Sequence, residues 1–167
     1  QPDALICLGD VATIGPQPKE VLTTLQKLDC VFIQGNHDEA MLNPKKAADL
    51  NIHASLVSNL EWGISLLEPH DITFLEAFQS TYKINLDADK TLFCFHATPL
   101  NNIDLILATT PETVLDGFLS TTNAAVMAGG HTHIQMLRKH HGRLLINPCR
   151  VDNSFTEPPP NYNPTLS

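Results

Sequence analysis

The chain has little positive charge. Its 167 residues include ten Lys and Arg against eighteen Asp and Glu, which gives a net charge of −8. Nucleic-acid backbones and anionic membrane surfaces are bound by clusters of Lys and Arg. The charge balance therefore excludes a protein that mainly grips such surfaces, and it argues against a nuclease. It does not exclude a phosphate ester as substrate, because bound cations reverse the local field.

Two further features are absent. There is no apolar run of about 18 residues, the length that a membrane helix needs, so we expect no membrane partner. The four cysteines (Cys7, Cys30, Cys94 and Cys149) form no C-x-x-C pair, so neither a zinc–cysteine cluster nor a disulfide framework is expected. This pattern favours a reducing compartment, and we predict a cytoplasmic location. Hydrophobic residues make up 43% of the chain, enough for the core of about one domain.

The order of apolar segments predicts an α/β protein. Residues 4–8 and 30–33 are short apolar runs on either side of an amphipathic stretch at 19–28, which predicts a parallel strand pair with a right-handed helical crossover. Residues 39–80 are predicted to be helical in pieces, with Trp62 in the core. The remaining predictions are strands at 82–85, 91–95 and 124–128, a helix at 111–119, and a hairpin of 134–138 with 143–146 around His140-His141-Gly142.

Side chains able to bind metal ions follow four of the strand-like runs. They are Asp10, then Asn36, His37 and Asp38, then His96, and then His131 with His133. Strand ends in an open α/β sheet lie along one edge, where ligands bind, so residues distant in sequence can meet there. Carboxylate, amide oxygen and imidazole together suit divalent ions such as Mn²⁺, Fe²⁺ or Zn²⁺. The other four histidines (His53, His70, His140 and His141) are not part of this pattern of potential ligands and are predicted to be solvated.

These segments resemble a known family. Gly9-Asp10, Gly35-Asn36-His37-Asp38, His96 and Gly130-His131-Thr132-His133 resemble, in order and spacing, the signature of the calcineurin-like metallophosphoesterases. Residues 8–18 are similar to the branch of small single-domain bacterial and archaeal phosphodiesterases, and the resemblance covers roughly residues 4–151. It implies a four-layer α/β/β/α sandwich, here with its first strand and final strands missing.

The resemblance also implies roles. Asp10 would bridge two divalent ions (Mn, Fe, Zn or Ni, with Mn favoured in assays), with Asn36, His96 and His131 on one ion and His133 on the other. His37 would be the general acid that protonates the leaving oxygen, with Asp38 orienting it. The two ions would activate a hydroxide for attack on a small-molecule phosphate ester.

The chain departs from the family pattern in two places. The family begins with an Asp-x-His pair that completes the second metal site, and no such pair precedes Asp10. We therefore expect a domain at 1–151 that is incomplete at its N-terminus, followed by a proline-rich loop or tail at 152–167. In addition, Cys149-Arg150-Val151-Asp152 stands where the family usually has Gly-Ser-Val-Gly.

Three functions stay open. A phosphodiester is the favoured substrate, and a phosphomonoester or phosphoprotein is the second choice. The third is a non-catalytic scaffold, since some relatives with this fold have become interaction modules. Such relatives typically lose the leaving-group histidine, and the presence of His37 favours an enzyme. The sequence gives no oligomeric state.

Overall fold

The described residues form helices and strands in the predicted order. The computed structural model describes residues 2–87 and 89–148. The strands are β1 (Ile6–Cys7), β2 (Val31–Phe32), β3 (Thr81–Asp87), β4 (Lys90–Phe95), β5 (Val126–Ala128), β6 (Met136–His140) and β7 (Arg143–Asn147). The helices are α1 (Pro18–Leu25), α2 (Asn36–Leu42), α3 (Val57–Ser65), α4 (Pro69–Glu76) and α5 (Glu112–Phe118), with 3₁₀ turns η1 (Pro44–Lys46) and η2 (Ala54–Leu56).

The smaller sheet is the predicted parallel pair. Ile6 lies opposite Val31, and Cys7 lies opposite Phe32. Helix α1 connects the two strands but ends three residues before the predicted boundary, because the amide of Leu28 turns to the carbonyl of Leu25 rather than continuing the α-helical pattern. Leu28 is consequently exposed and does not extend the buried stripe.

The larger sheet has the strand order β3-β4-β5-β7-β6. Its inner strands β4, β5 and β7 are parallel, and the edge strands β3 and β6 are antiparallel to their neighbours. His140 pairs with Arg143, so the β6–β7 turn has only two central residues, His141 and Gly142. Both have positive φ (46° and 78°), which is the geometry of a type I′ hairpin turn.

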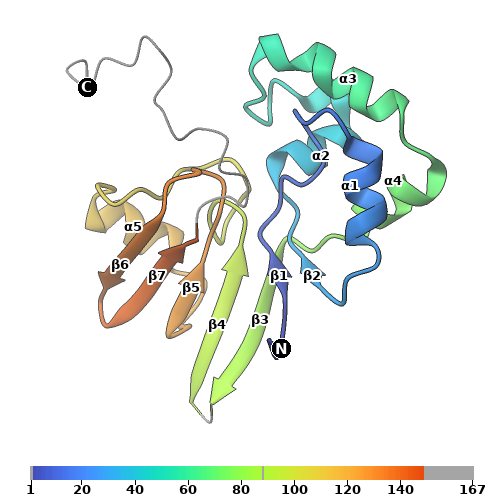
Figure 1. Ribbon diagram of the computed structural model, residues 1–167. Coiled ribbons are helices and arrows are strands. Elements are labelled where there is room, and N and C mark those ends of the chain that lie inside the picture. Colours follow the sequence, from blue (N-terminus) through green and yellow to red (C-terminus); the bar gives the residue numbers. More distant parts are fainter. Residues whose placement is uncertain (1, 88, 149–167) are drawn as a thin grey trace.

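Three apolar clusters separate four layers. One joins α1–α4 to the small sheet, around Leu22, Phe32 and Leu75. A second lies between the two sheets, where Ile33 packs near Cys94 and Ala128. The third joins the large sheet to α5 and includes Phe95, Leu115, Leu119, Met127 and Leu145. Figure 1 shows α1–α4 and α5 on opposite sides of the two sheets. The expected α/β/β/α architecture is confirmed.

Side-chain alternation on β4 explains how one strand serves two cores. Cys94 faces the small sheet, whereas Phe93 and Phe95 face α5. Successive residues of a strand point to opposite faces, so an almost wholly apolar strand can be buried on both.

The prediction that Trp62 lies in the core is wrong, because its side chain is 46% exposed. It lies on α3 between the buried positions Leu60 and Gly63, and therefore on another face of that helix. The proposed boundary at residues 151/152 and the segment 149–152 lie outside the described residues.

Candidate metal centre

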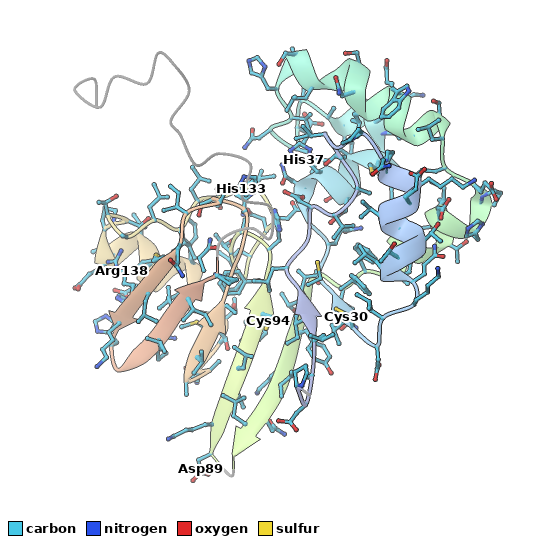
Figure 2. All side chains as sticks on the ribbon, in the orientation of Figure 1. Cys30, His37, Asp89, Cys94, His133 and Arg138 are labelled. Carbon is cyan, nitrogen blue, oxygen red and sulfur yellow. The ribbon has the colours of Figure 1, made fainter. Side chains whose placement is uncertain are left out.

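The predicted site residues follow the carboxyl ends of four strands. Asp10 follows β1, Asn36 to Asp38 open α2 directly after β2, His96 follows β4, and His131 lies in the loop after β5. Figure 2 shows His37 and His133 at this same end of the sheets. The two parallel sets of strands thus deliver residues from four separate segments to one edge.

Asp10, His96 and His131 meet in space. One ligand atom from each lies within 4.8 Å of the other two. His96 Nε2 is 3.2 Å from Asp10 Oδ2 and 3.1 Å from His131 Nδ1. These three residues are separated by up to 121 positions in sequence, and only the packing of the two sheets brings them together.

The orientation of His96 is suited to a cation. Its Nδ1 lies 2.6 Å from the carbonyl oxygen of Leu8, and a carbonyl only accepts, so Nδ1 carries the hydrogen. Nε2 of the neutral ring is then a lone-pair atom that faces a carboxylate oxygen and another imidazole. A backbone carbonyl that fixes the tautomer in this way is a common support of metal-binding histidines. A divalent ion between these three acceptors removes their mutual repulsion.

The electrostatics support the same interpretation. Burial raises the pKa of Asp10, but the hydrogen bond and charge of His96 outweigh it, so the pKa lies below its ordinary value. Burial lowers the pKa of His96, but Asp10 outweighs burial there too, and the pKa is raised. A proton on His96 thus occupies the position that a metal ion would take. The pKa of His131 is lowered by burial and by the charge of His96, so its ring is held neutral, as metal ligation requires.

Asn36 supplies an unsatisfied acceptor. Its side chain is buried, and its Nδ2 donates to the carbonyl of Leu50 at 2.9 Å. Its Oδ1 is buried without a hydrogen-bond partner, one of two such side-chain atoms in the described residues. Such an oxygen costs about 1–3 kcal/mol unless a partner satisfies it. A hard divalent ion is a suitable partner, so this donor set fits a metal ion.

The backbone of the site is strained. Asp10, His131 and His133 all have φ near +60°, at 61°, 62° and 56°. Non-glycine residues rarely adopt this left-handed conformation, and it persists where the surrounding structure enforces it, often at functional sites. Three of the five predicted metal ligands share it.

His37 and His133 lie around this group. The backbone amide of His37 donates to Asp10 Oδ1 at 3.0 Å. Burial lowers the pKa of the half-buried His37 ring, Asp10 opposes this shift, and the charges of His96 and His133 add to it. His133 is exposed and close enough to influence both His37 and His131.

Asp38 contacts backbone amides rather than the His37 ring. Its fully buried carboxylate accepts from the amides of Asp10 (2.8 Å), Val11 (3.0 Å) and Gly35 (2.9 Å). Among the described residues no hydrogen bond joins it to His37. The sequence suggested that Asp38 orients His37, whereas these contacts make it a clamp between the loop after β1 and the start of α2.

This clamp leads to a pH-dependent prediction. Burial and the nearby Asp10 raise the pKa of Asp38 from 3.8 to about 6, against three backbone hydrogen bonds. A raised carboxyl pKa stabilises the fold fully below the unfolded value and loses that effect as the pH rises through the folded value. In the metal-free protein, we expect the stability loss caused by Asp38→Asn to be largest near pH 4 and about 2 kcal/mol smaller near pH 7. Urea unfolding across this range measures the difference, and a constant difference would contradict the raised pKa.

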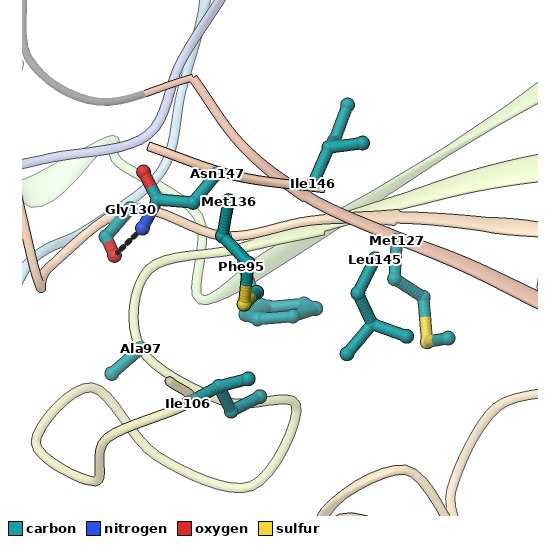
Figure 3. A pocket seen from close by; sticks show the side chains of 10 residues that line it. Phe95, Ala97, Ile106, Met127, Gly130, Met136, Leu145, Ile146 and Asn147 are labelled. Carbon is teal, nitrogen blue, oxygen red and sulfur yellow. Dashed lines mark hydrogen bonds between the residues drawn. The ribbon is translucent and has the colours of Figure 1, made fainter. Parts of the chain in front are cut away.

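Asn147 is a site residue that the sequence indicated only as the end of the family pattern. Its Nδ2 donates to the carbonyl of Gly130 at 2.6 Å and to Thr132 Oγ1 at 3.0 Å. The end of β7 thereby fixes the loop that carries His131 and His133. Figure 3 shows the Asn147–Gly130 bond beside a small apolar void of about 10 Å³, which can hold one water molecule at most.

A larger polar cavity of about 320 Å³ opens beside His96. Gln34, Glu39, Thr98 and Asn102 are among its lining residues, and Asn102 Nδ2 donates to Glu39 Oε2 at 3.0 Å. This cavity has room for a small substrate next to His96.

The remaining histidines divide into two groups. His53 and His70 are exposed, as predicted. The prediction that His140 is solvated is wrong: it is 2% exposed and contacts Asp116. His140 is the last residue of β6, and the hairpin end packs against α5, which covers it. His141 is exposed but also contacts Asp116.

Fold and site together define a class: an α/β/β/α sandwich with a candidate metal centre at the carboxyl edge of two facing sheets. The chain belongs to the calcineurin-like phosphoesterase superfamily, whose domain model matches residues 1–163. None of the helices formed by the described residues combines the length and the hydropathy that a membrane span requires.

Individual relatives are distant in sequence. The chain is 24% identical over 147 residues to an uncharacterized protein of Methanocaldococcus jannaschii, covering 88% of this chain and 58% of the relative. A hypothetical protein from Pyrococcus horikoshii has a similar structure, with a TM-score of 0.74 and 15% identity, covering 89% of this chain and 64% of the other. A metallophosphoesterase from Sphaerobacter thermophilus gives a TM-score of 0.65 and 21% identity, covering 89% and 66%. The chain therefore spans less than two thirds of these relatives, and at this identity the structures support the fold alone.

Proposed function

We propose that the protein hydrolyses phosphate esters, most favourably a phosphodiester, in a metal-dependent reaction. The observation that carries the proposal is the meeting of Asp10, His96 and His131 around one point. Membership of the phosphoesterase superfamily supports the reaction type.

The chain's own residues divide between two ions. Asp10, Asn36, His96 and His131 would hold the first. Asp10 and His133 would contribute to the second, and we propose Mn²⁺ as the ion that supports activity in assays. When bound, such ions neutralise the phosphate and make a water molecule acidic enough to attack at neutral pH.

The cysteine pattern supports a cytoplasmic location, with Cys7, Cys30 and Cys94 present as free thiols.

His37 is proposed to donate a proton to the leaving oxygen. Its backbone amide donates to Asp10 Oδ1, and its ring is close enough to Asp10 and His96 for their charges to affect its pKa. Its pKa, lowered by burial, makes the protonated ring a stronger acid than a solvated imidazolium. Asp38 contributes by holding Asp10 and Gly35 together, which positions His37 from the backbone side.

The substrate is proposed to be a small phosphate ester. The polar cavity beside His96 supports a small polar group over a long polymer, and the net charge of −8 disfavours nucleic acid. A phosphomonoester or phosphoprotein is the second candidate. A metal-binding scaffold without activity is the third, and the presence of His37 weighs against it.

The test begins with protein stripped of metal by a chelator. We expect added Mn²⁺ to raise hydrolysis of bis(p-nitrophenyl) phosphate at least about 100-fold above the stripped protein, with a smaller effect on p-nitrophenyl phosphate. The rate is followed by release of p-nitrophenol, and Asp10→Asn serves as the inactive control. Faster hydrolysis of the monoester would reverse the order of the substrates. Stoichiometric Mn²⁺ binding without hydrolysis of either compound would favour the scaffold.

A further inference from the structure

A second group of ligand atoms lies away from the candidate active site. Asp116 of α5, His140 at the end of β6 and His141 in the following turn each offer one ligand atom, and the three atoms lie within 4.8 Å of one another. His140 Nε2 is 2.8 Å and His141 Nε2 is 3.1 Å from the same carboxylate oxygen, Asp116 Oδ1.

The turn geometry explains how two consecutive histidines reach one point. Successive residues of a strand point to opposite faces. His141 leaves the strand with a φ of 46°, which brings its ring beside that of His140, with a centroid separation of 4.1 Å. Nε2 of the buried His140 faces the exposed carboxylate of Asp116, so Nε2 is the nitrogen directed toward a shared point.

Asp116 has no competing cationic side chain among the described residues. Its ion-pair partners there are these two histidines. The guanidinium of Arg143 is instead engaged with the carbonyls of Leu119 and Thr122. The hydrogen bond from His140 holds the pKa of Asp116 below its usual range, and the charge of His141 adds to this against the opposing effect of burial, so the carboxylate is available in its charged form.

We propose that Asp116, His140 and His141 form a binding site for Zn²⁺. Two imidazoles and a carboxylate suit zinc and do not suit Mg²⁺ or Ca²⁺, which prefer oxygen ligands. Ligand atoms around a tetrahedral Zn²⁺, with bonds of about 2.0 Å, lie roughly 3.3 Å apart. The observed distances of 2.8 and 3.1 Å need only a small opening. Since Asp116 and His141 are exposed, water completes the coordination.

The site would fasten α5 to the tip of the β6–β7 hairpin. The other end of this hairpin pairs Met136 with Asn147, and Asn147 holds the loop of His131 and His133. Zinc bound at the tip would therefore have a structural role, at the end of the hairpin opposite the candidate active site. The proposal does not depend on hydrolytic activity.

Zinc content and thermal stability test the site. Protein is dialysed against Zn²⁺, and the bound metal is counted for the wild type, His141→Ala and Asp116→Asn, with His53→Ala as control. We expect His141→Ala and Asp116→Asn each to bind one equivalent of Zn²⁺ less than the wild type. The control His53→Ala should bind the same amount as the wild type. Both changed side chains are exposed, so the fold tolerates their loss.

Saturating Zn²⁺ is expected to raise Tm in the wild type by about 3–5 °C more than in His141→Ala. Hydrolysis with Mn²⁺ is expected to be unchanged in His141→Ala, because this residue lies outside the proposed active site. Equal zinc content in the wild type and both variants would overturn the proposal. An equal loss in His53→Ala would also overturn it, since the binding would then be general to surface histidines.

Discussion

Replacing His37 with alanine is expected to lower the turnover of a phosphodiester by about 10²–10⁴-fold, with metal binding retained. The proposed loss is that of the proton donated to the leaving oxygen, and general acid catalysis contributes a factor of this size. The His37 ring itself holds no ion in the proposed site. Its backbone amide, which donates to Asp10 Oδ1, persists in the variant. Steady-state kinetics together with Mn²⁺ titration measure the two properties separately.

The dependence of the His37→Ala defect on the leaving group distinguishes a general acid from a residue with only a structural role. A diester with a poor, alkyl leaving group needs protonation more than one that releases p-nitrophenolate. The defect of His37→Ala should therefore be larger for the alkyl ester. His53→Ala, which changes an exposed histidine outside both clusters, should leave both rates unaltered. An equal loss on the two esters would remove His37 from the acid role, and lower metal content would point to a structural effect.

Replacing Gly35 with alanine is expected to lower the affinity for Mn²⁺ by about 10–100-fold, the usual size of a change in the support of a ligand. A Cβ at Gly35 would lie 2.0 Å from Asp10 Oδ1 and 2.8 Å from the Asp10 backbone nitrogen. The Asp10 carboxylate must then shift from the position in which its Oδ2 lies 3.2 Å from His96 Nε2. Since the backbone of Asp10 is also held by Asp38, a stability loss of about 1–3 kcal/mol is expected as well. Calorimetric titration and urea unfolding measure these effects.

Gly15→Ala is the matched control for this variant. Gly15 lies in the loop that follows Asp10, and a Cβ there meets nothing within 4 Å. We expect its stability to stay within about 0.5 kcal/mol of the wild type and its metal affinity to be unchanged. Normal Mn²⁺ affinity in Gly35→Ala would show that Asp10 does not bind the ion through the carboxylate position beside Gly35 and His96.

Most elements were predictable from local patterns. The apolar runs at 4–8 and 30–33 flanking an amphipathic helix gave the parallel pair β1–β2, and turn residues correctly indicated the β6–β7 hairpin. Errors arose where packing overrides composition. Trp62 is a large apolar residue of a type usually found in the core, yet it lies on a face of α3 that is exposed to solvent. His140 is a polar residue next to a turn, where side chains are usually exposed, yet it is buried against α5. Burial depends on neighbours from distant segments, which a local pattern does not contain.

The candidate ligands were predictable for a different reason. A metal-binding side chain after each of several strands is a pattern that depends on the order of strands, not on their packing. The site's supports were not predictable in this way. His96 contacts the carbonyl of Leu8, and Asp38 accepts from the amide of Asp10. Every residue except proline carries both of these backbone groups, so the sequence does not mark which positions will be the partners.

The amino-acid sequence was enough to indicate which side chains are candidate metal ligands and that they follow strands, because the chemistry of a side chain is local. The three-dimensional packing was needed to show that Asp10, His96 and His131 come together and that Asp116 meets His140 and His141. It was also needed to show that Asp38 accepts from backbone amides. The physical reason is that each of these contacts joins segments far apart in the chain, or fixes the orientation of a side chain. Distances and orientations of that kind are set by the packing of sheets and helices against one another.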